Sequence, residues 1–537
     1  MQSIIVKRDK YPPIFGGMGF HNNEAMLYPI TEKEHFDQVL CKCYREIAPG
    51  FMRTFAGFVN WTKQSMDGFA DYYERMQKVT DTPMYLASAK GQIHFSEEEM
   101  EAYCENVADG LQYLKKERGM NHIRYYCFSN EMSQGGWGEL MRDLPLFKRY
   151  HEMLYRAFQN RNLDISLLAT DASGYENWNT MDWAYENMSR ITEDYCLHIY
   201  ERGHGLEDLS FYQFFYDKCA EKTLKAIKRD NKRLILGEIG VQTKSHHLVF
   251  NPGVTIDACH YYSDPETCAY SALMLVEMAF AAINAGVYAL AYWSFTDYPD
   301  PYSCAYSEKP GYAKTWGECE KFISGTTDSK YNKWGAFRWE DDGDYSPKSF
   351  WWGIAPMIKL FKRNSKVLTV DTGDDLLRSC ALLNKDSSVS MGIVNRSTEP
   401  KEIKLDSDLF RKAVRVYEYD PYNVPYNRFG DLQETAAVLD PENLVYTLKP
   451  NSITFFTTDY QEKAKRVQAQ NVVYQDGKLT WDAVADPNHC YYRVYAGDTK
   501  GFRPSAKNQI ASTVACDLPA DGKAYYKVLS VDQWGNV

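Results

Sequence analysis

The sequence lacks an excess of basic residues. Lysine and arginine number 61 against 72 aspartates and glutamates, so the formal net charge at pH 7 is −11. Surfaces that bind nucleic acids are usually basic, because contacts to phosphate supply most of the affinity. The densest charged runs, 115–118 and 228–233, are interrupted by acidic residues and are typical of solvated helix ends. We therefore expect no nucleic-acid partner.

The sequence also lacks paired cysteine motifs and a visible leader. Its cysteines number 13, an odd count, and no CxxC motif occurs. Secreted disulfide frameworks usually pair an even number of cysteines at regular spacings, so reduced thiols are expected here. No long apolar segment follows Met1, and a secretory signal requires one. The sequence thus predicts a cytoplasmic location, with secretion left open if a leader has been removed.

No apolar run is long enough to span a membrane without carrying a charge. The stretch 272–293 is mostly apolar, but it contains Glu277 and Gly286. A charge inside a spanning helix is costly. We therefore predict a buried helix, a break at the glycine and a buried strand, and no membrane partner.

Several short motifs of known chemistry are absent as well. There is no GxSxG, which disfavours an α/β-hydrolase. There is no GxGxxG, which disfavours a dinucleotide-binding open sheet. The adjacent His246 and His247 do not form a zinc site, and no HxxxH or CxxC supports one. We expect neither a catalytic metal nor a cofactor.

What the sequence does contain is an alternation of apolar runs and helical patterns, with 15% aromatic residues. The apolar runs span 14–20, 50–58, 83–89, 122–129, 164–170, 194–200, 233–239 and 287–295. The helical patterns span 68–79, 97–118, 144–160, 211–229, 270–285 and 350–361. Eight strands that mostly alternate with helices predict an α/β fold, the (β/α)8 TIM barrel.

After the predicted barrel, the alternation of strands and helices gives way to an aromatic segment and then to short alternating apolar runs. An aromatic segment, 296–352, follows the eighth run and is expected on the C-terminal face, beside any active site. Short alternating runs at 389–394, 414–419, 445–448 and 453–457 then predict a β-sandwich, to which residues 4–7 add a strand. The runs at 472–474, 478–481, 491–496, 513–517 and 524–531 resemble a fibronectin type III module. The predicted domains are 1–365 (catalytic barrel), 366–460 (β-sandwich) and 461–537 (fibronectin type III-like module).

Two glutamates stand where a barrel carries its catalytic groups. Glu131 follows the fourth run and Glu238 ends the seventh, and polar residues at strand C-termini of such a barrel are typically catalytic. Cleavage of a glycosidic bond needs one carboxyl group to protonate the leaving oxygen and one carboxylate to bond the anomeric carbon. Two like charges placed close together push one pKa up, which divides these roles.

This arrangement resembles glycoside hydrolase clan A. In that clan the glutamate of an Asn-Glu pair after strand four is the acid/base, and a glutamate on strand seven is the nucleophile. The resemblance assigns these roles to Glu131 and Glu238, and it places Asn130 at the sugar 2-hydroxyl. Many members have proline after the pair, whereas this chain has Met132. The order of barrel, sandwich and module also looks like family 39, which includes β-xylosidases and α-iduronidases.

Further positions match the clan pattern. Arg53 in strand two resembles its arginine near the nucleophile, His198 and Tyr200 in strand six resemble its histidine and tyrosine, and Trp293 in strand eight resembles its tryptophan beneath the sugar. Taken singly, the arginine also fits a structural ion pair, and the histidine and the tryptophan fit an ordinary core. Trp137, His21 and Asn22 are further candidates for substrate contact, with core or loop roles as the alternatives.

The sequence therefore predicts a retaining glycoside hydrolase that cleaves a β-linked sugar through two glutamates, with a carbohydrate as its partner. One alternative is a non-catalytic carbohydrate-binding barrel with interaction modules. A second alternative is another barrel enzyme, such as a metal-dependent aldolase or lyase. Long insertions after strands seven and eight favour a pocket, and hence exo-action or short oligosaccharides. Nothing in the sequence selects an oligomeric state.

Overall fold

The computed structural model describes residues 1–22, 33–56, 61–77, 81–87, 96–132, 142–241, 269–299, 331–332, 335–338, 345–433, 435–461 and 468–537. Trp137, His246, His247 and most of the aromatic segment 296–352 lie outside these residues.

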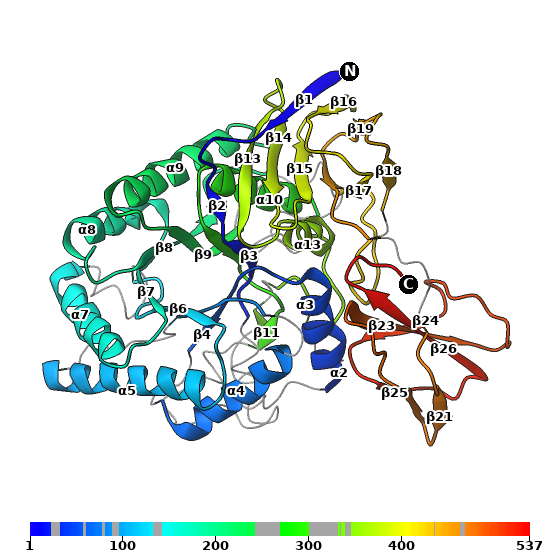
Figure 1. Cartoon of the computed structure of the whole chain (residues 1–537), viewed down its shortest axis with the longest axis horizontal. Coiled ribbons are helices and arrows are strands. Elements are labelled where there is room, and N and C mark those ends of the chain that lie inside the picture. The colour runs from blue at the N-terminus through cyan, green and yellow to red at the C-terminus, as the bar shows by residue number, and fades with distance from the viewer. Residues whose placement is uncertain are drawn as a thin grey trace.

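An eight-stranded parallel sheet forms the centre of the molecule (Figure 1). Its strands are β3 (Gly17–Phe20), β4 (Met52–Phe55), β5 (Met84–Ala87), β6 (Ile123–Cys127), β7 (Ser166–Ser173), β8 (Asp194–Glu201), β9 (Leu234–Val241) and β10 (Ala289–Tyr292). They pair in the order β3-β10-β9-β8-β7-β6-β5-β4. A parallel bridge between His21 and Arg53 joins the two ends, so the sheet closes into the predicted barrel. Each predicted apolar run overlaps one of these strands, and β7, β8 and β9 extend one to three residues beyond their runs.

Helices cover the outside of the barrel, and α4, α5, α7, α8 and α9 follow one another around it (Figure 1). The helices are α2 (Lys33–His35), η2 (Phe36–Leu40), α3 (Cys41–Ile47), α4 (Lys63–Gln77), α5 (Glu97–Lys116), α7 (Leu144–Asn160), η4 (Tyr175–Asn177), α8 (Asn179–Asn187), α9 (Phe211–Asp230), α10 (Ser271–Asn284) and α13 (Trp351–Leu360). Capping residues determine where helices α5 and α7 begin. Ser96 and Glu99 form a capping box on α5, and the Asp143 side chain accepts from the Leu146 amide on α7.

The apolar stretch 272–293 folds as predicted. Helix α10 is buried on all its faces because it packs against barrel strand β9 and also against strands β14 and β15 of the next domain. Gly286 then adopts φ +87°, a left-handed conformation that suits glycine, and strand β10 follows. Among the described residues, no helix is both long enough and apolar enough to cross a membrane.

The β-sandwich follows the barrel and includes the N-terminal strand. Its strands are β1 (Gln2–Lys7), β2 (Ile14–Phe15), β13 (Ser365–Asp371), β14 (Leu377–Leu383), β15 (Val389–Asn395), β16 (Lys401–Asp406), β17 (Val414–Tyr419), β18 (Ala437–Leu439), β19 (Val445–Leu448) and β20 (Ser452–Thr457). Strand β1 lies antiparallel to β13 and parallel to β16, which confirms the strand predicted at 4–7. Ile403 from β16 and Val416 from β17 meet in one core, although their strands are distant in the sheet order. A short pair, β11 (Tyr298–Pro299) and β12 (Tyr331–Asn332), stands apart.

Two three-stranded sheets form the C-terminal module, which we define as residues 468–537. One sheet orders β21 (Val473–Gln475), β22 (Lys478–Thr480) and β25 (Asp517–Pro519), and the other orders β24 (Gln509–Thr513), β23 (His489–Gly497) and β26 (Tyr525–Asp532). The run 513–517, predicted as one strand, instead links two strands: Thr513 ends β24, Asp517 begins β25, and residues 514–516 turn between them. It fails as a strand because the chain there crosses from one sheet to the other.

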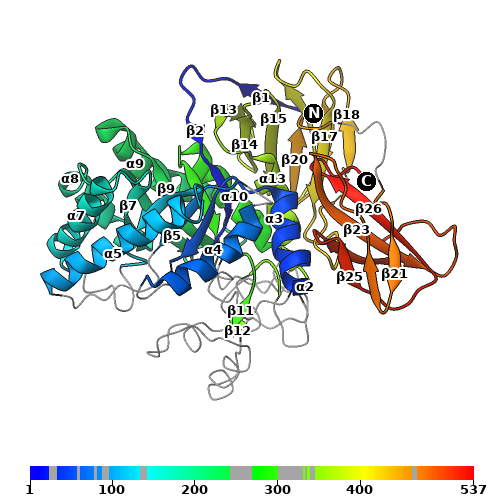
Figure 2. The same cartoon turned by 60° about the horizontal axis from the view of Figure 1, so that its bottom comes forward.

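The C-terminal module packs against α3 of the barrel (Figure 2). Lys42 on α3 is fully buried, and its Nζ lies 2.7 Å from Oε2 of Glu46 and 2.7 Å from Oδ1 of Asp431. The other Asp431 oxygen lies 3.1 Å from Nε of Arg493, and the Tyr491 hydroxyl donates to Glu46 at 3.0 Å. A buried network of charges thus joins the barrel, the sandwich and the module.

Candidate active site

Arg53 on β4 is the residue around which the site assembles. Its side chain is fully buried, and one terminal nitrogen, Nη1, donates to Glu238 and lies 2.9 Å from Nδ1 of His21. The second, Nη2, donates to Oδ1 of Asn130 at 2.6 Å and to Oδ2 of Asp171 at 3.0 Å. Burial alone would lower the pKa of Arg53, but the charges of Glu238 and Asp171 outweigh it and hold the pKa well above its ordinary value. Arg53 is therefore a fixed cation at the carboxyl ends of the strands.

Glu238 on β9 is buried, and both of its oxygens are hydrogen-bonded. Its Oε1 accepts from Arg53, and its Oε2 accepts from the Tyr200 hydroxyl at 2.5 Å. Burial raises the pKa of the Glu238 carboxyl, whereas the positive charges of His198 and Arg53 act in the opposite direction. The bonds hold this side chain in one orientation.

Glu131 occupies a different environment. It follows β6 and keeps 17% of its side chain exposed, and its Oε1 lies 3.3 Å from Nδ1 of His198. Its φ of +47° is left-handed, which costs a non-glycine residue roughly 1–3 kcal/mol. One oxygen of Glu131, one of Glu238 and a nitrogen of His198 all lie within 4.8 Å of one another. The two predicted catalytic glutamates therefore meet over the barrel.

His198 on β8 lies between the two glutamates and Asp171. Its Nε2 is 2.8 Å from Oδ1 of Asp171, and its Nδ1 is 3.7 Å from Oε2 of Glu238. Burial alone would lower the pKa of His198, but the charges of Asp171 and Glu238 outweigh it and raise the pKa to about 9. The pKa of Asp171 moves the other way: burial opposes the shift, yet the charges of His198 and Arg53 lower it. At neutral pH this pair is charged.

The aromatic candidates border this cluster. Trp293 after β10 is half-buried, and its ring centroid lies 4.3 Å from that of His21 and 5.8 Å from that of Phe55. Asn22 is buried beside them. Its carbonyl accepts from the Thr54 hydroxyl at 2.7 Å, and its Oδ1 accepts from a tyrosine hydroxyl of α4 at 3.4 Å. Contact of His21, Asn22 and Trp293 with substrate remains a prediction.

Two residues of the site were not anticipated from the sequence. Asp171 lies on β7, one position beyond the end of the fifth apolar run, and Tyr85 lies on β5. The Tyr85 hydroxyl donates to Oδ1 of Asp171 at 2.7 Å. The signal that identified Glu131 and Glu238, a polar residue at the end of a barrel strand, applies equally to Asp171.

Within the described part of the chain, two triplets of side chains lie close enough together to hold a metal ion. Asp171, Cys196 and His198 form one, and Glu131, His198 and Glu238 form the other. Both need a neutral histidine as ligand, whereas the charges around His198 favour its protonated form. The guanidinium of Arg53 also contacts a carboxylate of each triplet. Arg53 and His198 therefore already supply the positive charge that a metal ion would bring to these carboxylates.

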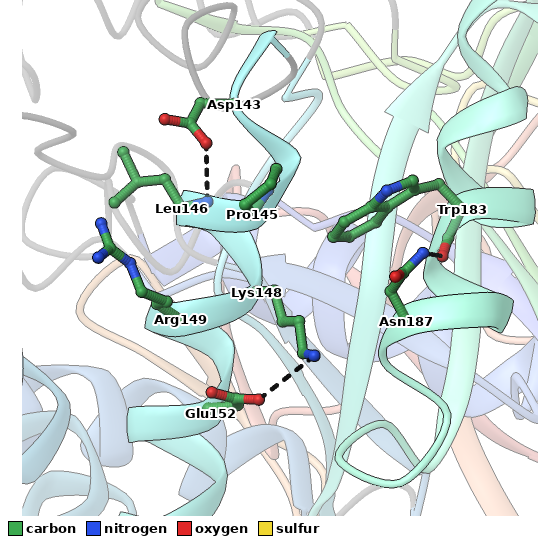
Figure 3. A pocket seen from close by; sticks show the side chains of 8 residues that line it. All are labelled: Asp143, Pro145, Leu146, Lys148, Arg149, Glu152, Trp183 and Asn187. Atoms are coloured by element: carbon green, nitrogen blue, oxygen red, sulfur yellow. Dashed lines mark hydrogen bonds and ion pairs between the residues drawn. The ribbon is translucent and has the colours of Figure 1, made fainter.

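A groove of about 530 Å3 lies elsewhere, between α7 and α8 (Figure 3). It is lined by Asp143, Pro145, Leu146, Lys148, Arg149, Glu152, Trp183 and Asn187. Its carboxylates are engaged, since Asp143 caps α7 and Glu152 lies 3.7 Å from Lys148. None of its lining residues belongs to the cluster around Arg53, and we do not assign the chemistry to it.

The fold is similar to that of solved glycoside hydrolases, whereas the sequence has no match. No protein-family model and no curated protein matches the sequence. Among solved structures, a family 39 β-xylosidase from Caulobacter crescentus is similar, with a TM-score of 0.53 at 12% identity over 85% of this chain and 99% of that one. A family 51 α-L-arabinofuranosidase from Bifidobacterium longum gives 0.57 at 14% identity over 85% and 99%. The chain therefore shares the barrel fold of these glycoside hydrolases.

A further similar structure is described as a conserved exported protein from Bacteroides fragilis, with a TM-score of 0.62 at 10% identity over 85% of this chain and 100% of that one. It gives no support to the predicted cytoplasmic location. Structural similarity at 10–14% identity shows the fold alone, so the chemistry is argued from the site itself.

Proposed function

We propose that this chain is a retaining glycoside hydrolase that cleaves a β-linked sugar by double displacement. The observation that carries the proposal is the meeting of Glu131 and Glu238, whose nearest carboxylate oxygens lie within 4.8 Å. Retaining glycosidases hold their carboxyl groups about 5–5.5 Å apart, and inverting enzymes about 6.5–9.5 Å apart. The close approach favours retention, and the unequal exposure of the two groups favours unequal roles.

In the first step Glu238 attacks the anomeric carbon, and the bond from that carbon to the leaving oxygen breaks. The proton of Glu131 passes to that oxygen, and the leaving group departs as an alcohol. In the second step a water molecule gives a proton to Glu131 while its oxygen attacks the same carbon. The ester bond to Glu238 breaks, both glutamates return to their starting states, and two inversions give net retention.

The surrounding side chains suit these steps. Arg53 and Tyr200 bond the two oxygens of Glu238, which stabilises the ionised nucleophile and fixes its direction. Asn130 uses its oxygen to accept from Arg53, so its amide nitrogen is left to donate to the sugar 2-hydroxyl. Trp293, half-buried, offers an aromatic face as the floor of the sugar site.

The test is hydrolysis of a panel of aryl β- and α-glycosides by the wild-type protein and by Glu238→Ala. We expect the wild type to release the aryl group and the variant to lose turnover, with azide restoring it as the glycosyl azide of inverted configuration. Glu201→Gln is the matched control, because Glu201 is also a buried strand-end carboxylate but contacts Tyr175 and His204 instead. It should keep turnover.

Other outcomes would point to the alternatives. Binding of sugars without turnover, changed only in strength by Glu238→Gln, would indicate a non-catalytic carbohydrate-binding barrel. Turnover abolished by a chelator would indicate a metal-dependent enzyme. The cytoplasmic location remains a prediction from the sequence alone.

A further inference from the structure

Asp171 is the one buried carboxylate of the site to which the proposed mechanism gives no role. Its side chain is fully buried, and three groups converge on it. Its Oδ2 accepts from Arg53 at 3.0 Å, while its Oδ1 lies 2.8 Å from His198 and accepts from Tyr85 at 2.7 Å. Its φ of +62° is left-handed, a conformation that a non-glycine residue adopts at a cost. A strained backbone and a buried charge are retained only where the surrounding contacts hold them in place.

The two cations that hold Asp171 each reach a different catalytic glutamate. Arg53 turns its other terminal nitrogen to Glu238, and His198 turns its other ring nitrogen to Glu131 at 3.3 Å. Resting on the proposed function, we propose that Asp171 is a positioning residue that aligns both catalytic carboxylates, acting through Arg53 on Glu238 and through His198 on Glu131. It does not touch the sugar.

The proposal also fixes where the proton of His198 lies. The ring faces Asp171 from β7, Glu131 from the end of β6, Glu238 from β9 and Arg53 from β4. With Asp171 ionised, the ring holds a proton on both nitrogens, so Nδ1 donates to Glu131. Without that charge the pKa of His198 would fall, and a ring that had lost its Nδ1 proton would present a lone pair to the glutamate. Asp171 thereby decides whether His198 is a donor or an acceptor toward the acid/base.

The neighbouring strand leaves room for this contact. A Cβ at Gly237 on β9 would lie 2.7 Å from Sγ of Cys196 and 2.9 Å from Nε2 of His198. Atoms at these separations overlap, so a larger residue would push the ring away from Asp171. Gly237→Ala therefore disturbs the same contact without changing any charge.

The experiment compares Asp171→Asn with Asp171→Glu and with Asp194→Asn. Asp194 is a buried carboxylate at the opposite end of β8, paired with Arg233, and it serves as the control for lost buried charge. We expect Asp171→Asn to lower kcat/KM about 100-fold, because small misplacements of catalytic groups have effects of this size. Losing the adjacent positive charge on His198 should also move the acid limb of the pH profile, which reports Glu238, upward. Asp171→Glu should restore part of each effect, and Asp194→Asn should leave the profile unchanged.

A second readout does not depend on activity. Imidazole resonances of His198, assigned by their loss in His198→Gln, should titrate near pH 9 in the wild type and at a lower pH in Asp171→Asn. Unchanged titration together with an unchanged pH profile would overturn the proposal. If Asp171→Asn does not fold, Gly237→Ala should lower the pKa of His198, and an unaltered titration there would overturn it equally. If the wild type cleaves no glycoside, the proposed function fails, while the titration still decides whether Asp171 controls His198.

Discussion

Replacing Arg53 by alanine tests whether one buried cation holds the site together. Arg53 is the partner of both Glu238 and Asp171, and its side chain and theirs are at most 4% exposed. Removing one member of a buried ion pair typically costs 3–5 kcal/mol, because the other charge is left uncompensated. His198, Tyr200 and Tyr85 still contact the orphaned carboxylates. We therefore expect Arg53→Ala to lower the free energy of unfolding by about 4 kcal/mol at neutral pH.

The loss of unfolding free energy in Arg53→Ala should be larger at pH 8 than at pH 5. The folded pKa of Glu238 is already raised, so the folded state binds this proton more tightly than the unfolded state does, and stability falls as the pH rises through that pKa. The folded pKa of Asp171 is lowered, so its contribution is present above the ordinary value of 3.8 and is lost as the pH falls. Without Arg53 both carboxylates take up protons more readily, and the difference between variant and wild type should shrink from pH 8 to pH 5.

Urea unfolding followed by circular dichroism at both pH values measures this difference. Arg118→Ala is the control, since Arg118 pairs with Asp67 and Asp71, whose side chains are 30% and 56% exposed. Exposed pairs contribute roughly 0–1 kcal/mol, so the control should change little. A loss of less than about 1 kcal/mol in Arg53→Ala, or a loss equal at the two pH values, would refute the reasoning.

Three further substitutions have definite expected outcomes. Tyr200→Phe removes a hydrogen bond to ionised Glu238, and we expect kcat to fall by about 10-fold or more with the acid limb of the pH profile moved upward, as measured on an aryl glycoside. Ser96→Ala removes the capping box of α5 and should cost about 1 kcal/mol in urea unfolding with kcat unchanged. Asp431→Ala leaves Lys42 paired with one carboxylate and should cost about 3 kcal/mol or more, with thermal unfolding as the check; an unchanged midpoint would contradict the buried network.

The barrel was predictable because its strands are buried on both faces. Such strands appear in the sequence as short apolar runs, and each of the eight runs overlaps one. The prediction of α10 and β10 within 272–293 is confirmed for the same reason, with Gly286 marking the break. Helices α3 and α8 were not predicted, since they are short and carry no long periodic pattern. The three-domain division and the fibronectin type III assignment stay predictions.

From the sequence, a residue of the candidate site could be predicted only where it occupies a recognisable position in a single predicted strand. Glu131 and Glu238 were predicted from their positions at the ends of apolar runs and Arg53 from the resemblance to clan A, and the structure brings the three together. The role of Asp171 depends on a contact with Arg53 across 118 sequence positions, which no local pattern records. Trp137, the remaining candidate, lies outside the described residues.

The buried network between α3 and the C-terminal module has a consequence for the order of synthesis. Lys42 emerges early from the ribosome, yet Asp431 and Arg493, which complete its surroundings, come roughly 400–450 residues later. At about 5–20 residues per second, that interval is roughly 20 to 90 s. During this interval Lys42, which is buried in the folded protein, lacks Asp431 and the residues around it. Until residues 431–493 have been synthesised, Glu46 on the same helix is available to Lys42 whereas Asp431 is not, so this buried network is completed late in synthesis.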